Sequence, residues 1–169
     1  IHYLESEAVM RELAKYLGED VDYYGMLGLL HDIDWGITKV NPKDHITKAP
    51  EILRVAEFDE DFIETVISHT YGVDCADSLN KSRTKKIEFA LAASETITGL
   101  IHAYALVRDK TVSDMRVEGL KKKYENKNFA ANVDRSIIKE CENLEMSLDE
   151  FFKIAIDGIK SIKDVVGLR

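Results

Sequence analysis

The chain has 169 residues, of which 45% are hydrophobic and 32% are charged, and its formal net charge is −8. That length and composition fit one folded domain with a hydrophobic core and exclude a disordered chain. The acidic balance argues against binding along a nucleic acid polymer. A small phosphorylated substrate stays open, because a bound metal ion can invert the local field of an acidic protein.

The cysteines and the hydropathy pattern indicate in which cellular compartment the protein works. Cys75 and Cys141 are isolated and lie in different contexts, which is typical of free thiols in a reducing compartment. No apolar run approaches the ~20 residues of a membrane-spanning helix, and no signal-peptide pattern is visible. The sequence starts at Ile1 rather than Met, which leaves room for residues upstream. We therefore expect a cytoplasmic protein that works without a membrane.

Hydrophobic residues in the first half recur with helical spacing. Gly18 favours a helix end before it, Asp59 favours a helix start after it, and Pro50 is tolerated in a first turn. The predicted helices run over residues 4–17, from a cap at Asp20 or Asp22 to about 30, over 46–56 and over 60–69, with a loop over 35–44.

The second half continues the helical pattern after a polar, turn-like stretch over residues 71–83. The predicted helices run from about 87 to 107 with a bend at Gly99, from a cap at Ser113 through Leu120, from a cap at Asp134 to about Leu144, and from Ser147 or Asp149 to Val166. No pair of alternating strands appears. We predict an all-α fold with about seven to nine helices in a single domain over 1–169.

The adjacent pair His31-Asp32 is the most informative feature of the sequence, because it ends the short apolar run 26–30. Neighbouring residues on a helix point about 100° apart, so both can reach one ion only where the helix opens. An imidazole beside a carboxylate suits a first-row or hard divalent metal. The pair predicts a metal site at the end of a buried helix.

Three further histidines and one glutamate could complete such a site. His2, His45 and His69 all lie at predicted helix ends, where a ligand can face a cleft. Glu95 follows the apolar stretch 90–94, where a buried carboxylate is costly unless it is paired or bound. Taken singly, each histidine could be a capping residue and Glu95 could face solvent. Their joint order along the chain favours the metal site.

These residues and their neighbours resemble the HD-domain superfamily of metal-dependent phosphohydrolases, which is named for the His-Asp doublet. The similarity rests on the segments 28–34, 49–53 and 92–99 together with His2, His45 and His69. It implies a compact helical HD fold, with an HD core over about 1–110 and a C-terminal helical extension over about 111–169.

The resemblance also implies ligand roles. One divalent ion (Mn, Fe, Ni, Co, Zn or Mg) would be held by His2, His31, Asp32 and Glu95. In relatives with two ions the second shares the Asp of the doublet, and His45 and His69 lie where its histidines would be. Glu95 replaces the usual Asp, and Thr70 stands where such relatives often have a second consecutive histidine. One ion or two therefore both stay open.

Three residues are candidates for roles beside the metal. Asp34 follows the doublet, and it could hold a metal-bound water, hold a ligand histidine, or cap a turn. Lys48 lies about one turn from His45 and could approach the same cleft. Arg135, with the basic run 121–123 near it, could grip a phosphate, since a guanidinium fork binds two oxygens. The alternative is that these basic residues are solvated.

The sequence therefore favours a metal-dependent phosphohydrolase acting on a small phosphorylated compound or nucleotide. Two alternatives stay open: an HD fold that binds a metal or ligand without turnover, and a di-iron oxygenase of the same fold. Apolar faces on the C-terminal helices leave a homodimer open.

Overall fold

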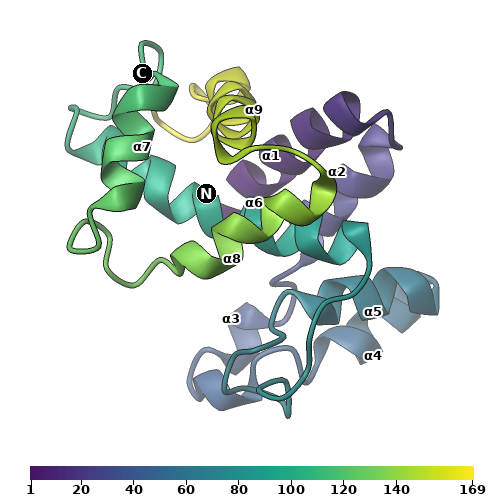
Figure 1. The fold of residues 1–169 in the computed structure, drawn as a ribbon. Helices are drawn as coiled ribbons and strands as arrows, with labels where there is room; N and C mark the ends of the chain where they lie inside the picture. The colour runs from purple at the N-terminus through teal and green to yellow at the C-terminus, as the bar shows by residue number, and fades with distance from the viewer.

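A computed structural model describes residues 1–169, and every regular element in it is a helix, with no strand. This confirms the predicted all-α fold. The elements in chain order are α1 (His2–Leu17), α2 (Val21–Leu30), α3 (Trp35–Thr38), the 3₁₀ helix η1 (Pro42–Asp44), α4 (Ala49–Val55), α5 (Glu60–Ser68), α6 (Lys86–Leu106), α7 (Val117–Glu125), α8 (Arg135–Lys139), the 3₁₀ helix η2 (Glu140–Leu144) and α9 (Leu148–Ser161) (Figure 1).

Several helices begin and end where their capping residues predict. The side chains of Asp20, Asp59 and Asp134 accept backbone N–H groups in the first turns of α2, α5 and α8. Ser147 and Glu150 form a reciprocal capping box at the start of α9. Gly18 ends α1 in the left-handed conformation, with φ 74°. Local sequence therefore sets these boundaries.

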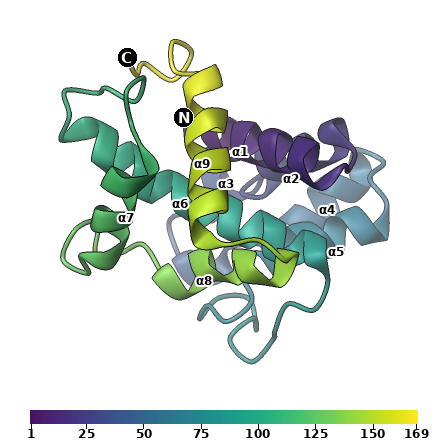
Figure 2. The same ribbon diagram turned by 45° about the horizontal axis from the view of Figure 1, so that its top comes forward.

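The long helix α6 runs through the centre of the molecule and contributes much of the hydrophobic core. Helices α1 and α9 pack against it and against each other, and α9 lies across both of them in Figure 2. By length and composition α6 could cross a membrane, but 56% of its apolar window is buried within the fold, as in the core helix of a globular protein. Both cysteines, Cys75 and Cys141, are buried and unpaired.

The contact between α1 and α2 depends on a glycine. A Cβ atom at Gly28 would lie 2.6 Å from the carbonyl oxygen of Ser6 and 2.9 Å from Cα of Glu7, so only glycine allows the two helices to come this close. Gly28 lies one turn before His31, the residue at which α2 ends. The close approach therefore brings the end of α2 to the first turn of α1, where His2 lies.

The segment between α2 and α4 differs from its prediction. Residues 35–44 contain α3 and η1 rather than only loop, and the helix expected over 46–56 begins at Ala49. The backbone N–H groups of Ile46 and Lys48 bond to the carboxylate of Asp34, and Ile46 has φ 69°. A residue in the left-handed conformation cannot be part of a right-handed helix, which explains the later start.

The helix expected from about 87 to 107 is present as α6, which continues past Gly99 to Leu106. Two other predictions in the second half are wrong in detail. Ser113 caps no helix, because its N–H bonds to the carbonyl of Arg169 at the chain end, and α7 begins at Val117. The last helix ends at Ser161 rather than near Val166. In the Ser113 case a contact across the fold replaced the local signal.

Candidate metal centre

Five elements converge on one cluster of histidines and carboxylates. His2 is the first residue of α1, and His31 with Asp32 follows the last turn of α2. The remaining members come from three other places: His45 follows η1, His69 ends α5, and Glu95 lies within α6. All six side chains that the sequence predicted as metal ligands therefore lie in one place.

The first group of potential ligands contains His2, His31 and Asp32, whose ligand atoms lie within 4.8 Å of one another. The Nε2 atoms of His2 and His31 are 3.1 Å apart, and Asp32 Oδ2 lies 3.7 Å from His31 Nε2. Glu95 Oε2 lies 3.9 Å from His2 Nε2. Glu95, which stands where relatives usually have Asp, thus approaches this group on the side of His2.

The second group contains Asp32, His45 and His69, again within 4.8 Å. The Nε2 atoms of His45 and His69 are 3.1 Å apart. Asp32 Oδ1 lies 3.1 Å from His45 Nε2 and 3.4 Å from His69 Nε2. Asp32 therefore belongs to both groups, with one carboxylate oxygen toward each, so its side chain could contribute a ligand atom to either group.

The four histidines share one orientation, with Nδ1 anchored in the protein and Nε2 toward the cluster. His31 Nδ1 donates to the Gly28 carbonyl at 2.8 Å, and His69 Nδ1 donates to the Val66 carbonyl at 2.6 Å. His2 and His45 are held by side chains instead: their Nδ1 atoms lie 3.0 Å from Thr98 Oγ1 and 3.2 Å from Asp34 Oδ1. Such contacts fix the tautomer and leave the Nε2 lone pair free for a metal.

The spacing of the Nε2 atoms fits a metal ion. Two lone-pair nitrogens that face each other repel unless a proton or a cation lies between them. Nitrogens that are each about 2.1 Å from one ion are about 3.0 Å apart at a right angle and about 3.4 Å apart at a tetrahedral angle. The observed 3.1 Å in both histidine pairs falls inside that interval. The residues present therefore fit a divalent metal with mixed nitrogen and oxygen ligands.

Burial tunes the charges of the cluster. His31 is fully buried, and burial lowers its pKa to about 3, so its imidazole is neutral and able to bind a metal at neutral pH. Burial alone would raise the pKa of Asp32, but the imidazoles of His45 and His69 beside its carboxylate outweigh burial and hold the pKa well below the usual range. Burial raises the pKa of Glu95 to about 7. Asp32 is therefore a permanent anion, whereas Glu95 ionises near neutral pH.

Asp34 holds the loop that carries His45. Its fully buried carboxylate lies 3.2 Å from His45 Nδ1 and accepts the N–H groups of Ile46 and Lys48 at 3.2 and 3.0 Å. It therefore contacts the ring nitrogen of His45 that faces away from Asp32. Of the roles that the sequence left open, the contacts match that of a carboxylate supporting a ligand histidine.

The two predicted basic residues lie in different settings. Lys48 is exposed, and only its backbone N–H bonds toward the site, through Asp34. The guanidinium of Arg135 donates to the carbonyls of Tyr124, Phe129, Ala130 and Val133. Those bonds close the turn between α7 and α8 and occupy the N–H donors of Arg135. The contacts of Arg135 are therefore those of a structural residue rather than of the predicted phosphate clamp.

Sequence reasoning missed the support of His2. The buried hydroxyl of Thr98 donates to the Glu95 carbonyl at 2.6 Å and is therefore free to accept from His2 Nδ1. Thr98 lies three residues after Glu95, on the same face of α6, and this spacing could have predicted that it lies beside the cluster. The fifth histidine, His102, pairs with the buried carboxylate of Glu5 at 2.7 Å and is not part of either ligand group.

Comparison with protein families decides the family. A sequence profile described as "HD domain" matches residues 1–112, which hold all six clustered ligands. The chain belongs to the HD-domain family. Searches of curated proteins and of solved structures found no match. The HD-domain family typically consists of metal-dependent phosphohydrolases, and the cluster of His and Asp side chains is consistent with that chemistry.

Proposed function

We propose that this HD-domain protein is a metal-dependent phosphohydrolase that acts on a small phosphorylated compound or nucleotide. The observation that supports it best is the division of Asp32 between two histidine pairs, with Oδ2 toward His2 and His31 and Oδ1 toward His45 and His69. A carboxylate in that position can hold two divalent ions side by side, and paired ions suit displacement at phosphorus.

The chain's own residues prepare the site. The anchored Nδ1 atoms aim four imidazoles at the cluster through Nε2, so little rearrangement is needed when a cation enters. Asp32 supplies the fixed negative charge that the cation needs. Bound there, a divalent ion would supply the Lewis acidity that activates a water and polarises a phosphoryl oxygen. Glu95 accepts a proton near neutral pH, so its ionisation accompanies binding of the cation.

Metal content and phosphate release together test this function. The chain is stripped of metal, reloaded with Mn, Fe, Ni, Co, Zn or Mg in turn, and assayed for phosphate release from a panel of phosphomonoesters and nucleotides. We expect release that requires the metal and disappears in His69→Gln. His102→Gln is the matched control, because His102 is a half-buried histidine outside both groups.

The other outcomes identify the alternatives. Two bound irons with oxygen consumption and no phosphate release would indicate an oxygenase. Stoichiometric metal with neither activity would indicate a binding protein. A chain that takes up no metal after reconstitution would contradict the hydrolase proposal and both ligand assignments.

A further inference from the structure

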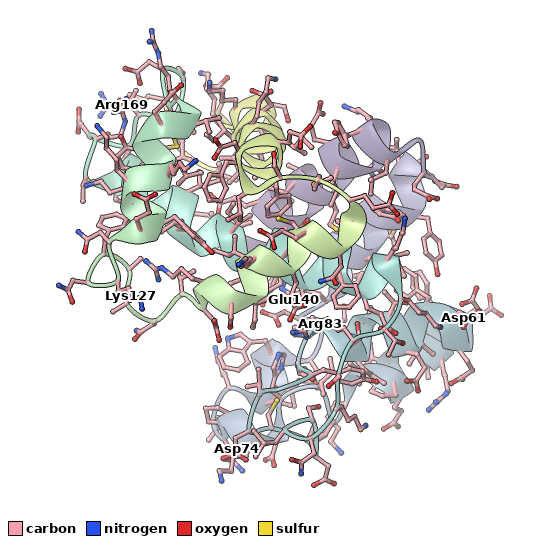
Figure 3. The ribbon with its side chains drawn as sticks, viewed as in Figure 1. Asp61, Asp74, Arg83, Lys127, Glu140 and Arg169 are labelled. Atoms are coloured by element: carbon pink, nitrogen blue, oxygen red, sulfur yellow. The ribbon has the colours of Figure 1, made fainter.

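Arg83 is a buried arginine that the proposed chemistry does not use. It lies in the segment between α5 and α6, and only 5% of its side chain is exposed. Its Nε and Nη2 atoms form a two-pronged ion pair with Glu140, at 2.5 and 2.8 Å. Figure 3 labels both residues where this segment passes next to the start of η2.

The remaining nitrogen of Arg83 binds the end of α5. Its Nη1 donates to the carbonyls of Ser68 at 2.8 Å, of His69 at 3.2 Å and of Tyr71 at 3.0 Å. These carbonyls belong to the last turn of α5 and to the residues after it, where the regular helical hydrogen bonds end and only the Ser68 carbonyl has another backbone donor, the N–H of Tyr71. His69 is among them, so Arg83 fixes the backbone from which that imidazole projects.

We propose that Arg83 and Glu140 form a brace that positions His69 in the metal centre. This inference rests on the metal centre of the proposed function. The brace adds to the contacts that hold His69. Its Nδ1 donates to the Val66 carbonyl, and Arg83 donates to its backbone carbonyl. Of the polar atoms of His69 in these contacts, only Nε2 faces Asp32. Arg83 and Glu140 are positioning residues, because neither touches the side chain of a potential ligand and Arg83 reaches only the backbone carbonyl of His69.

The brace joins two parts of the chain that the family match separates. Arg83 and His69 lie within residues 1–112, whereas Glu140 belongs to η2 in the C-terminal extension. The extension therefore takes part in building the metal centre. Within that centre Arg83 donates only to the backbone at the end of α5, and it makes no hydrogen bond to α1 or α2, which carry His2 and His31.

Arginine suits this place for a physical reason. A planar guanidinium offers five N–H donors in fixed directions, so it can grip a carboxylate with two and helix-end carbonyls with another. A lysine has one compact charge and cannot hold both partners in that geometry. Removing Glu140 leaves the guanidinium buried with a charge that the carbonyls alone do not neutralise. The brace should then relax at His69.

Metal titration of the whole chain tests the brace. Metal-free protein is titrated with Zn²⁺ by calorimetry, comparing wild type, E140Q and E145Q. E145Q is the matched control: Glu145 also pairs across the fold, with Lys86 Nζ at 2.6 Å, but both side chains are exposed and neither contacts α5. We expect E140Q to bind one ion as wild type does and the second about 10- to 100-fold more weakly, and E145Q to match wild type.

A second readout needs no metal. The ¹⁵N chemical shifts of the His69 ring, measured in the metal-free chain, should change in E140Q and R83K and stay unchanged in E145Q. Should E140Q fail to fold, E140D takes its place, with the same expectations.

The outcomes separate the brace from the proposed function. Equal weakening of both ions in E140Q, or second-ion binding within twofold of wild type, would overturn the brace. So would a wild-type chain that binds only one ion. A wild-type chain that binds two ions, loses one in E140Q and releases no phosphate would overturn the hydrolase and leave the brace standing.

Discussion

The two histidine pairs of the metal centre are held in different ways. His2 and His31 lie at the ends of α1 and α2, which pack tightly because Gly28 removes a side chain between them. His45 follows η1 and His69 ends α5, and their positions depend on buried polar contacts with Asp34 and Arg83. The first pair is thus set by helix packing, and the second by hydrogen bonds and ion pairs. We therefore expect the His2–His31 pair to keep its geometry when a supporting polar contact is removed, and the His45–His69 pair to lose it.

Asp32→Ala should have the largest effect, because Asp32 is the one side chain present in both ligand groups. Partners of metal ligands are worth about 10- to 100-fold in affinity, so loss of a shared ligand should exceed 100-fold at both positions. Elemental analysis after reconstitution measures this, with the exposed Asp61 changed to Ala as a control. One ion retained in full by Asp32→Ala would mean that the two groups are independent.

Glu95→Gln tests the His2–His31 side of the cluster through the pH dependence of the free energy of unfolding. The pKa of Glu95 rises from 4.5 to about 7 on burial, so ionising it costs folding free energy as pH rises from 4.5 to 7. Without metal, the Gln variant should be more stable than wild type by up to about 3 kcal/mol at pH 8, with no difference near pH 4. Denaturant unfolding in chelator measures the gap. With metal the order should reverse, and a gap that is equal at both pH values would contradict the burial of this carboxylate.

Gly28→Ala tests the helix contact that sets the first pair. The new Cβ would lie 2.6 Å from the Ser6 carbonyl and push α1 away from α2. Overpacking of this kind costs about 1 to 3 kcal/mol, and we expect weaker binding at the His2–His31 position. Thermal unfolding and metal titration report the two effects. Gly36→Ala is the control, since nothing lies within 4 Å of a Cβ there.

Asp34→Asn tests the hydrogen bonds that support the His45–His69 pair. The two oxygens of Asp34 serve three donors, from His45, Ile46 and Lys48, and an amide has only one oxygen to offer. We expect the ion at the His45–His69 position to bind about 10- to 100-fold more weakly, and the other ion to bind as before. Calorimetric titration distinguishes the two positions. An equal loss at both would show that Asp34 supports the whole cluster.

The local sequence determined much of this protein. Apolar residues at helical spacing predicted an all-α fold, and capping residues such as Asp59 and Ser147 predicted helix starts, because both signals act within a few residues of the chain. The doublet His31-Asp32 and the residues around it indicated the HD-domain family, which the family match confirms. The six potential ligands could be named for the same reason.

Only the tertiary structure decided how those ligands are grouped and supported. That Asp32 stands between two histidine pairs depends on four chain segments meeting, and no local pattern encodes such a meeting. The same holds for Arg83, which reaches Glu140 57 positions away, and for Arg135, whose donors turned to nearby carbonyls instead of a phosphate. A charged side chain can choose among many partners, and burial decides which one it takes.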